Sequence, residues 1–160
     1  MTMQVPETVL NATTADLRLE LFVRSLAPET ARPQQEAVIE RLRDLNDADE
    51  IADTELYVTG DCICPSTGAA ETETGRFLLD RYEAFEEWAD ENGVELVGFR
   101  DRCVDSSLTG ETVTGIQFPR LTLAVFADER LRFVAPVIRN GTETTVADAQ
   151  DEIERAIVQQ

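Results

Sequence analysis

The sequence predicts an α/β protein in which one mixed β-sheet carries helices packed on it. Three observations lead to this class. Two strand patterns near the start of the chain are each followed by a helix pattern, and such crossovers require parallel pairing of the first strands. Four strand patterns then follow without a helix between them, which favours an antiparallel extension. A capped helix pattern comes last, so the expected order is β-α-β-α-β-β-β-β-α.

The chain is expected to form one domain with a short lead-in. Its 160 residues, 42% of them hydrophobic, suffice for one sizeable core. Residues 1–15 are polar, rich in threonine and without periodicity, so we expect a flexible lead-in. Residues 16–160 then form a single α/β domain.

The first half of the chain contains two strands and the helix between them. Residues 17–26 form the first predicted strand, because the side chains are apolar at every second position from Leu17 to Val23. The helix begins after Thr30, a suitable N-cap, with Pro33 in its first turn. An acidic loop over 46–53 leads to the second strand, residues 54–64. The inward positions of this helix are Val38, Ile39, Leu42 and Leu45.

The second half begins with a long helix over residues 75–92, which ends at Asn92-Gly93. Its apolar stripe matches a helix face packed on a sheet, and this core reading is preferred to an aromatic ligand site. A turn at Asn140-Gly141 precedes a helix that opens with a box formed by Thr145 and Asp148 and runs to about residue 157. The stripe comprises Phe77, Leu78, Tyr82, Phe85, Trp88 and Ala89, and the strands are 94–104, 112–118, 121–127 and 131–138.

The last part of the chain resembles the second half of thioredoxin-like folds. The strand PRLTLAVF, a hairpin and a capped final helix carry the resemblance, which places Pro119 where that family keeps its cis-proline. Oxidoreductases of this family carry Cys-x-x-Cys where the first strand meets the first helix. Here that junction, residues 27–30, has no cysteine, so a scaffold or interaction role is favoured. A ferredoxin-like sandwich is the alternative arrangement.

The charge composition is unusual. There are 32 acidic residues against 14 basic ones, giving a net charge of −18, and all the basic residues are arginine. Acidic surfaces with arginine and no lysine resemble those of salt-in haloarchaea. In molar salt the Debye length is about 3 Å, so the net charge alone does not exclude nucleic acid. With no signal-peptide pattern and no apolar run long enough to span a bilayer, we expect a cytoplasmic protein that does not bind membranes.

The three cysteines are the candidate reactive groups. Cys62 and Cys64 are two positions apart on a predicted strand, so a disulfide between them would be strained. Either could pair with Cys103, and three thiolates could begin a metal site that an acid such as Asp61 or Asp105 would have to complete. The readings are therefore buried core residues, a redox-sensitive set or a weak metal site. The first is preferred because free cysteine is among the most buried residue types.

No catalytic constellation accompanies these residues. The chain has no histidine, no P-loop and no dinucleotide-binding glycine pattern, so we expect a non-enzymatic protein without a cofactor. Arg100 and Arg102 alternate on one predicted strand, and Arg130 and Arg132 lie in the last hairpin. These four are weak candidates for an anion-binding patch, although pairing with the surrounding acids explains them as well.

Four segments share their order along the chain with known proteins: LELFVRSLAPETARPQQEAVIERL, the Cys64-Pro65 step, ENGVEL, and SSLTGETVTGIQFPRLTLAVF followed by VAP. Together they resemble a group of short haloarchaeal proteins described as helix-turn-helix-domain proteins. The resemblance implies a regulatory or protein-interaction module with a transcription-linked role. A protein partner or a homodimer is expected, and DNA stays open without support from the residues themselves. The alternative function is a thiol-based redox or metal-binding protein.

Overall fold

The protein is a mixed α/β structure, as predicted. The computed structural model describes residues 17–24, 33–47, 53–59, 73–105, 112–127 and 129–158. In chain order its elements are β1 (Leu17–Val23), α2 (Pro33–Asp47), β2 (Asp53–Val58), α3 (Glu73–Asn92), β3 (Glu95–Leu96), β4 (Arg100–Asp105), β5 (Thr112–Gln117), β6 (Leu121–Ala127), β7 (Arg130–Ala135), β8 (Val137–Arg139), β9 (Thr142–Thr144) and α4 (Val146–Val158).

The central sheet has four strands in the order β2-β1-β6-β7. β1 and β2 are parallel, as the α2 crossover requires, and Leu21 of β1 is opposite Leu56 of β2. On its other side β1 pairs antiparallel with β6, and β6 pairs antiparallel with β7. The first strand of the chain therefore lies in the middle of the sheet.

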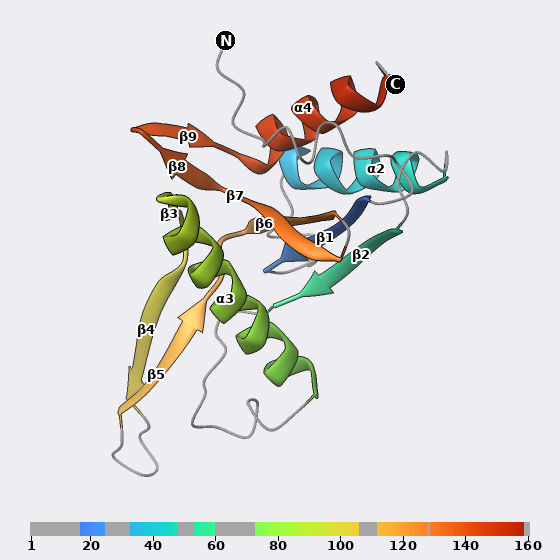
Figure 1. Cartoon of the computed structure of the whole chain (residues 1–160). Coiled ribbons are helices and arrows are strands. Elements are labelled where there is room, and N and C mark those ends of the chain that lie inside the picture. The colour runs from blue at the N-terminus through green and yellow to red at the C-terminus, as the bar shows by residue number, and fades with distance from the viewer. Residues whose placement is uncertain are drawn as a thin grey trace.

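Helices cover both faces of this sheet (Figure 1). The side chains of β1 alternate between the faces, and both sets are buried. Phe22 packs against Phe85 of α3 with ring centroids 5.7 Å apart, so α3 covers that face. α2 and α4 lie together on the opposite face, where the Gln150 side-chain amide donates to the Val38 carbonyl at 3.0 Å. The apolar stripe of α3 is core, as predicted.

Two strands that the sequence predicts to be continuous are each divided. The segment 94–104 forms β3 and β4 with Gly98 between them, where φ is 84°. A Cβ at Gly98 would lie 2.7 Å from the Cβ of Pro119, so only glycine fits this crossing. The segment 131–138 divides at Pro136 into β7 and β8, because proline has no N–H to donate to a ladder.

These divisions distribute the described strands among three sheets, and the prediction of a single sheet is wrong. Besides the central sheet there is a three-stranded sheet, β3-β8-β9, and a two-stranded sheet, β4-β5. The predicted turn at Asn140-Gly141 forms with positive φ at both residues, but it leads into β9, which was not predicted. The cis peptide bond in the described chain is Ala135–Pro136, so the expectation of a cis bond before Pro119 is also wrong.

Local capping signals are confirmed at two helix ends. At the start of α4 the Thr145 N–H donates to the Asp148 carboxylate, and the Asp148 N–H donates to the Thr145 hydroxyl, both at 3.1 Å. This reciprocal pair satisfies donors that the first helical turn leaves unpaired. At the end of α3, Gly93 has a φ of 64° and the Val94 N–H donates to the Ala89 carbonyl at 3.0 Å. These caps fix both helix boundaries near the predicted positions.

Candidate functional site

The described residues do not test whether the three cysteines form a site. Cys62 and Cys64 lie outside the described residues, so their distances to Cys103 stay a prediction. Cys103 lies in β4, where its backbone is opposite Thr114 of β5. In the described part of the chain there is no group of three or more residues of the metal-ligating types. The redox and metal readings therefore gain no support.

The four candidate arginines lie on two different sheets. Arg100, which is exposed, and Arg102 belong to β4 in the two-stranded β4-β5 sheet. Arg130 and Arg132 belong to β7, at one edge of the central sheet. The Arg132 Nε donates to the Ala127 carbonyl at 3.4 Å, a long hydrogen bond within the β6–β7 hairpin. The predicted anion-binding patch thus draws its arginines from two sheets, and it stays a prediction.

An ion cluster that sequence reasoning missed lies between β1 and α3. Glu20 of β1 has no exposed surface, and it accepts two hydrogen bonds from Arg81 of α3, at 2.7 and 2.9 Å. Arg18 forms a further ion pair with Glu20 at 3.1 Å. The hydrogen bond to Glu20 raises the pKa of the Arg81 guanidinium above its ordinary value. Two cations thus compensate the charge of one buried carboxylate.

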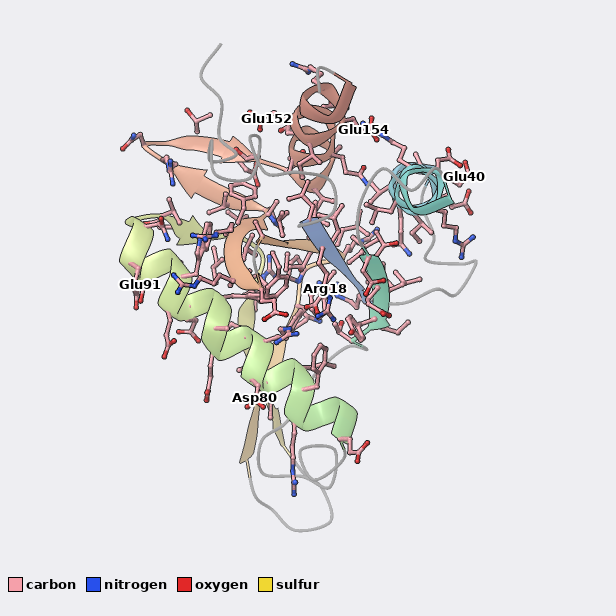
Figure 2. The ribbon with its side chains drawn as sticks, turned by 45° about the vertical axis from the view of Figure 1, so that its right-hand side comes forward. Arg18, Glu40, Asp80, Glu91, Glu152 and Glu154 are labelled. Carbon is pink, nitrogen blue, oxygen red and sulfur yellow. The ribbon has the colours of Figure 1, made fainter. Side chains whose placement is uncertain are left out.

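Aromatic rings enclose this cluster. The Arg81 guanidinium lies 4.6 Å from the ring centroid of Phe77 and 5.2 Å from that of Phe126, which allows cation–π attraction on both sides. Tyr57 of β2 packs against Phe77, with ring centroids 4.7 Å apart. Burial raises the pKa of the Tyr57 hydroxyl, and the negative charges of Glu20 and Glu55 raise it further. Figure 2 places Arg18 beside β1 and β2. The cluster fastens α3 to the sheet.

One sequence signal could have revealed this cluster. The run LRLELFV alternates as a strand does, and such alternation alone predicts that Glu20 lies on a polar, solvated face. However, strands of a parallel pair with helices on both sides are buried on both faces. A carboxylate in the middle of such a strand needs a buried cation.

A second arginine joins the two helices on the other face. Arg41 of α2 donates to both carboxylate oxygens of Glu154 in α4, at 3.0 and 2.7 Å, and to Asp151 at 2.6 Å. The hydrogen bond to Glu154 is the main cause that raises the pKa of Arg41 above its ordinary value. Figure 2 shows Glu154 on the side of α4 that faces α2. One arginine side chain thus forms ion pairs with two carboxylates, which suits an acidic chain without lysine.

The outer faces of the helices are acidic. Figure 2 shows Asp80 and Glu91 projecting from α3, and Glu40 from the outer side of α2. Along α3, seven exposed residues are acidic and one, Arg76, is basic. A surface of this kind repels the phosphates of nucleic acid at ordinary salt concentrations. The exposed acids of α3 are Glu73, Asp80, Glu83, Glu86, Glu87, Asp90 and Glu91.

The fold and these surfaces define an acidic α/β protein whose helices are joined to one another and to the sheet by arginine–carboxylate pairs. A family model described as a helix-turn-helix domain matches residues 11–157, and the chain belongs to this family. Membership indicates a regulatory role. No curated protein and no solved structure matches the chain. None of the helices in the described ranges is long and apolar enough to cross a bilayer.

The matched region runs from ahead of β1 into α4, so it contains nearly all of the described α/β fold. Among the described elements, no two helices follow one another directly, because β2 lies between α2 and α3, and the strands β3 to β9 lie between α3 and α4. The helices α2 and α4 do contact each other, but the contacting residues Arg41 and Glu154 are 113 positions apart. A DNA-reading helix pair joined by a short turn is therefore not part of the described structure.

Proposed function

We propose that the protein is a non-enzymatic, transcription-linked regulatory module that acts through protein association in the cytoplasm of a halophilic archaeon. Membership of the helix-turn-helix domain family supports the link to transcription. Among the described elements no two helices are joined by a short turn, and this observation carries the proposal of protein association, because such a helix pair is what reads DNA in helix-turn-helix proteins.

The arrangement of the central sheet supports a thioredoxin-like variant of the α/β class. The order β2-β1-β6-β7, with a parallel β1–β2 pair and helices on both faces, agrees with that proposal. A ferredoxin-like sandwich keeps its helices on one face of an antiparallel sheet. The junction after β1 reads Ala27-Pro28-Glu29-Thr30 and has no cysteine, which favours an interaction scaffold over an oxidoreductase.

Two measurements test this function. Deleting the gene should change specific transcripts, and the purified chain should not bind the DNA upstream of those transcripts in multimolar KCl. Binding is followed by fluorescence anisotropy with labelled duplexes. Unchanged transcripts would refute the link to transcription. A dissociation constant below about 10 nM for that DNA, within the usual range for specific binding, would refute action through protein association alone.

One observation favours a second candidate, direct contact with DNA through the β4-β5 sheet. Figure 1 shows this two-stranded sheet extending away from the central sheet, and Arg100 at the start of β4 is exposed. A two-stranded ribbon fits the major groove, and arginine is the commonest reader of guanine there. Replacing Arg100 and Arg102 by serine should then weaken binding and lower the salt slope by about one for each phosphate that these arginines neutralise. Arg155→Ser, on the exposed side of α4, is the matched control.

A further inference from the structure

The two edges of the central sheet differ in how they are covered. β7 forms one edge, and there α3 lies against it: the Trp88 indole N–H donates to the Arg132 carbonyl at 3.1 Å, and the Trp88 ring packs edge-on against Phe133. β2 forms the other edge, and no described strand pairs with its outer side. An uncovered edge strand is a template for pairing with another chain.

β2 also carries the large exposed hydrophobic side chains of the described structure. Leu56 is 37% exposed and Val58 is 46% exposed, although the residues opposite them in β1, Leu21 and Val23, are buried. Leu56 and Val58 are two positions apart, so both lie on the same face of the strand. Covering them would remove apolar surface from water, which stabilises association.

The outward backbone groups of β2 can be identified. The Thr59 N–H donates to the Val23 carbonyl at 2.8 Å, so Thr59 directs its backbone groups toward β1. Because these directions alternate along a strand, Thr54, Leu56 and Val58 direct their N–H and C=O groups toward the open edge. The residues with the exposed apolar side chains are thus also the ones with outward hydrogen-bonding groups.

We propose that a second copy of this chain pairs with this edge, β2 against β2 in antiparallel orientation about a twofold axis at Leu56. Thr54 then faces Val58 of the partner subunit, and both residues have outward backbone groups, so the ladder closes with regular hydrogen bonds. The two copies of Leu56 face each other. The central sheets join into one sheet of eight strands, with the apolar side chains of β2 gathered at the twofold axis.

The charges on β2 agree with this register. Glu55 faces Tyr57 of the partner subunit, and Asp53 faces Thr59 of the partner subunit, so no two carboxylates are opposite each other. Shifting the axis to Glu55 would set two glutamates face to face, which destabilises a strand pair. Asp53 also has a cation nearby, since Arg18 Nε lies 3.9 Å from its carboxylate. Of these two registers, the one with its axis at Leu56 is the one that keeps the carboxylates of β2 apart.

This inference names one partner for the association proposed above, but it stands without the link to transcription. The first test is sedimentation equilibrium of the full chain in multimolar KCl, where we expect a dimer. Leu56→Glu should weaken dimerisation by about tenfold or more, since it exchanges buried apolar surface for two facing carboxylates. Thr142→Glu, which adds the same charge at an exposed position of β9, should leave the dimer unchanged.

The register is tested by cysteine crosslinking after Cys62, Cys64 and Cys103 are replaced by serine. Residues in a hydrogen-bonded antiparallel pair have Cα atoms about 5.5 Å apart, within disulfide range. Leu56→Cys should crosslink to itself under mild oxidation. Thr54→Cys should crosslink only when mixed with Val58→Cys. Circular dichroism confirms that each variant is folded.

Three outcomes would overturn the proposal: a monomer at all concentrations, a dimer that Leu56→Glu leaves intact, or Thr54→Cys crosslinking to itself as readily as to Val58→Cys. A monomer in which the Leu56 and Val58 amides exchange slowly with deuterium would instead assign the edge to a segment of the same chain. None of these results depends on transcript levels, so this proposal and the proposed function fail independently.

Discussion

Replacing Arg81 by methionine tests whether the buried ion cluster holds α3 to the sheet. The substitution keeps most of the apolar stem between Phe77 and Phe126 but removes the cation that donates twice to Glu20. Removing one member of a buried ion pair typically costs about 3–5 kcal/mol, because the other charge is left uncompensated. Arg18 still faces Glu20 at 3.1 Å, so we expect the lower end, about 3 kcal/mol.

The assay is thermal and denaturant unfolding in the same concentrated KCl, followed by circular dichroism. A loss of about 3 kcal/mol corresponds to a fall in Tm of roughly 10 °C for a chain of this size. Arg76→Met, on the exposed side of the same helix, is the control and should change stability by less than about 0.5 kcal/mol. The double variant Glu20→Leu with Arg81→Met should recover most of the loss, because it removes both charges together.

Two results would refute this reasoning. A loss below about 1 kcal/mol for Arg81→Met would place the pair among ordinary surface ion pairs, which contribute little. A double variant that is destabilised by at least the sum of its single changes would mean that Glu20 and Arg81 do not act as a pair.

Three further predictions concern separate parts of the fold and are tested by unfolding measurements. Gly98→Ala should lower the free energy of unfolding by about 2–3 kcal/mol, because the position has positive φ and the new Cβ would have a contact of 2.7 Å. Gly141→Ala, with positive φ but nothing within 4 Å, should lower it by about 1 kcal/mol. A larger loss for Gly141→Ala than for Gly98→Ala would contradict the close contact between Gly98 and Pro119. Thr145→Ala should cost about 1 kcal/mol through loss of the α4 cap, and an unchanged midpoint would argue against it. Because the pKa of Tyr57 in the folded state is raised above its ordinary value of 10.0, its contribution to stability is complete below pH 10 and is lost as pH rises further. Tyr57→Phe should therefore make the loss of stability above pH 10 less steep. The same dependence of stability on pH in both proteins would count against the raised pKa.

The features that the sequence predicted are those with local causes. The alternation in β1 and the capping box at Thr145 depend on neighbours a few residues away, so the pattern alone identifies them. The parallel pairing of β1 and β2 follows from the helix between them. In each case the physical cause lies within the segment.

The features that were missed depend on partners far along the chain. The division of 94–104 comes from the close approach of Gly98 to Pro119, and the need of Glu20 for Arg81 appears only once α3 covers that face. Arg100 and Arg130 lie in different sheets because the predicted single sheet is divided. These causes are tertiary, and no window of the sequence contains both members.

The place of β1 in the middle of the sheet has a consequence for how the protein is made. The strand that pairs with one whole side of β1, β6, leaves the ribosome about 100 residues after it. At about 5–20 residues per second, this delay is about 5–20 s. During that time an apolar strand has an unpaired edge in a crowded cell. Until β6 is made, that edge of β1 stays open to mispairing, however stable the finished fold is.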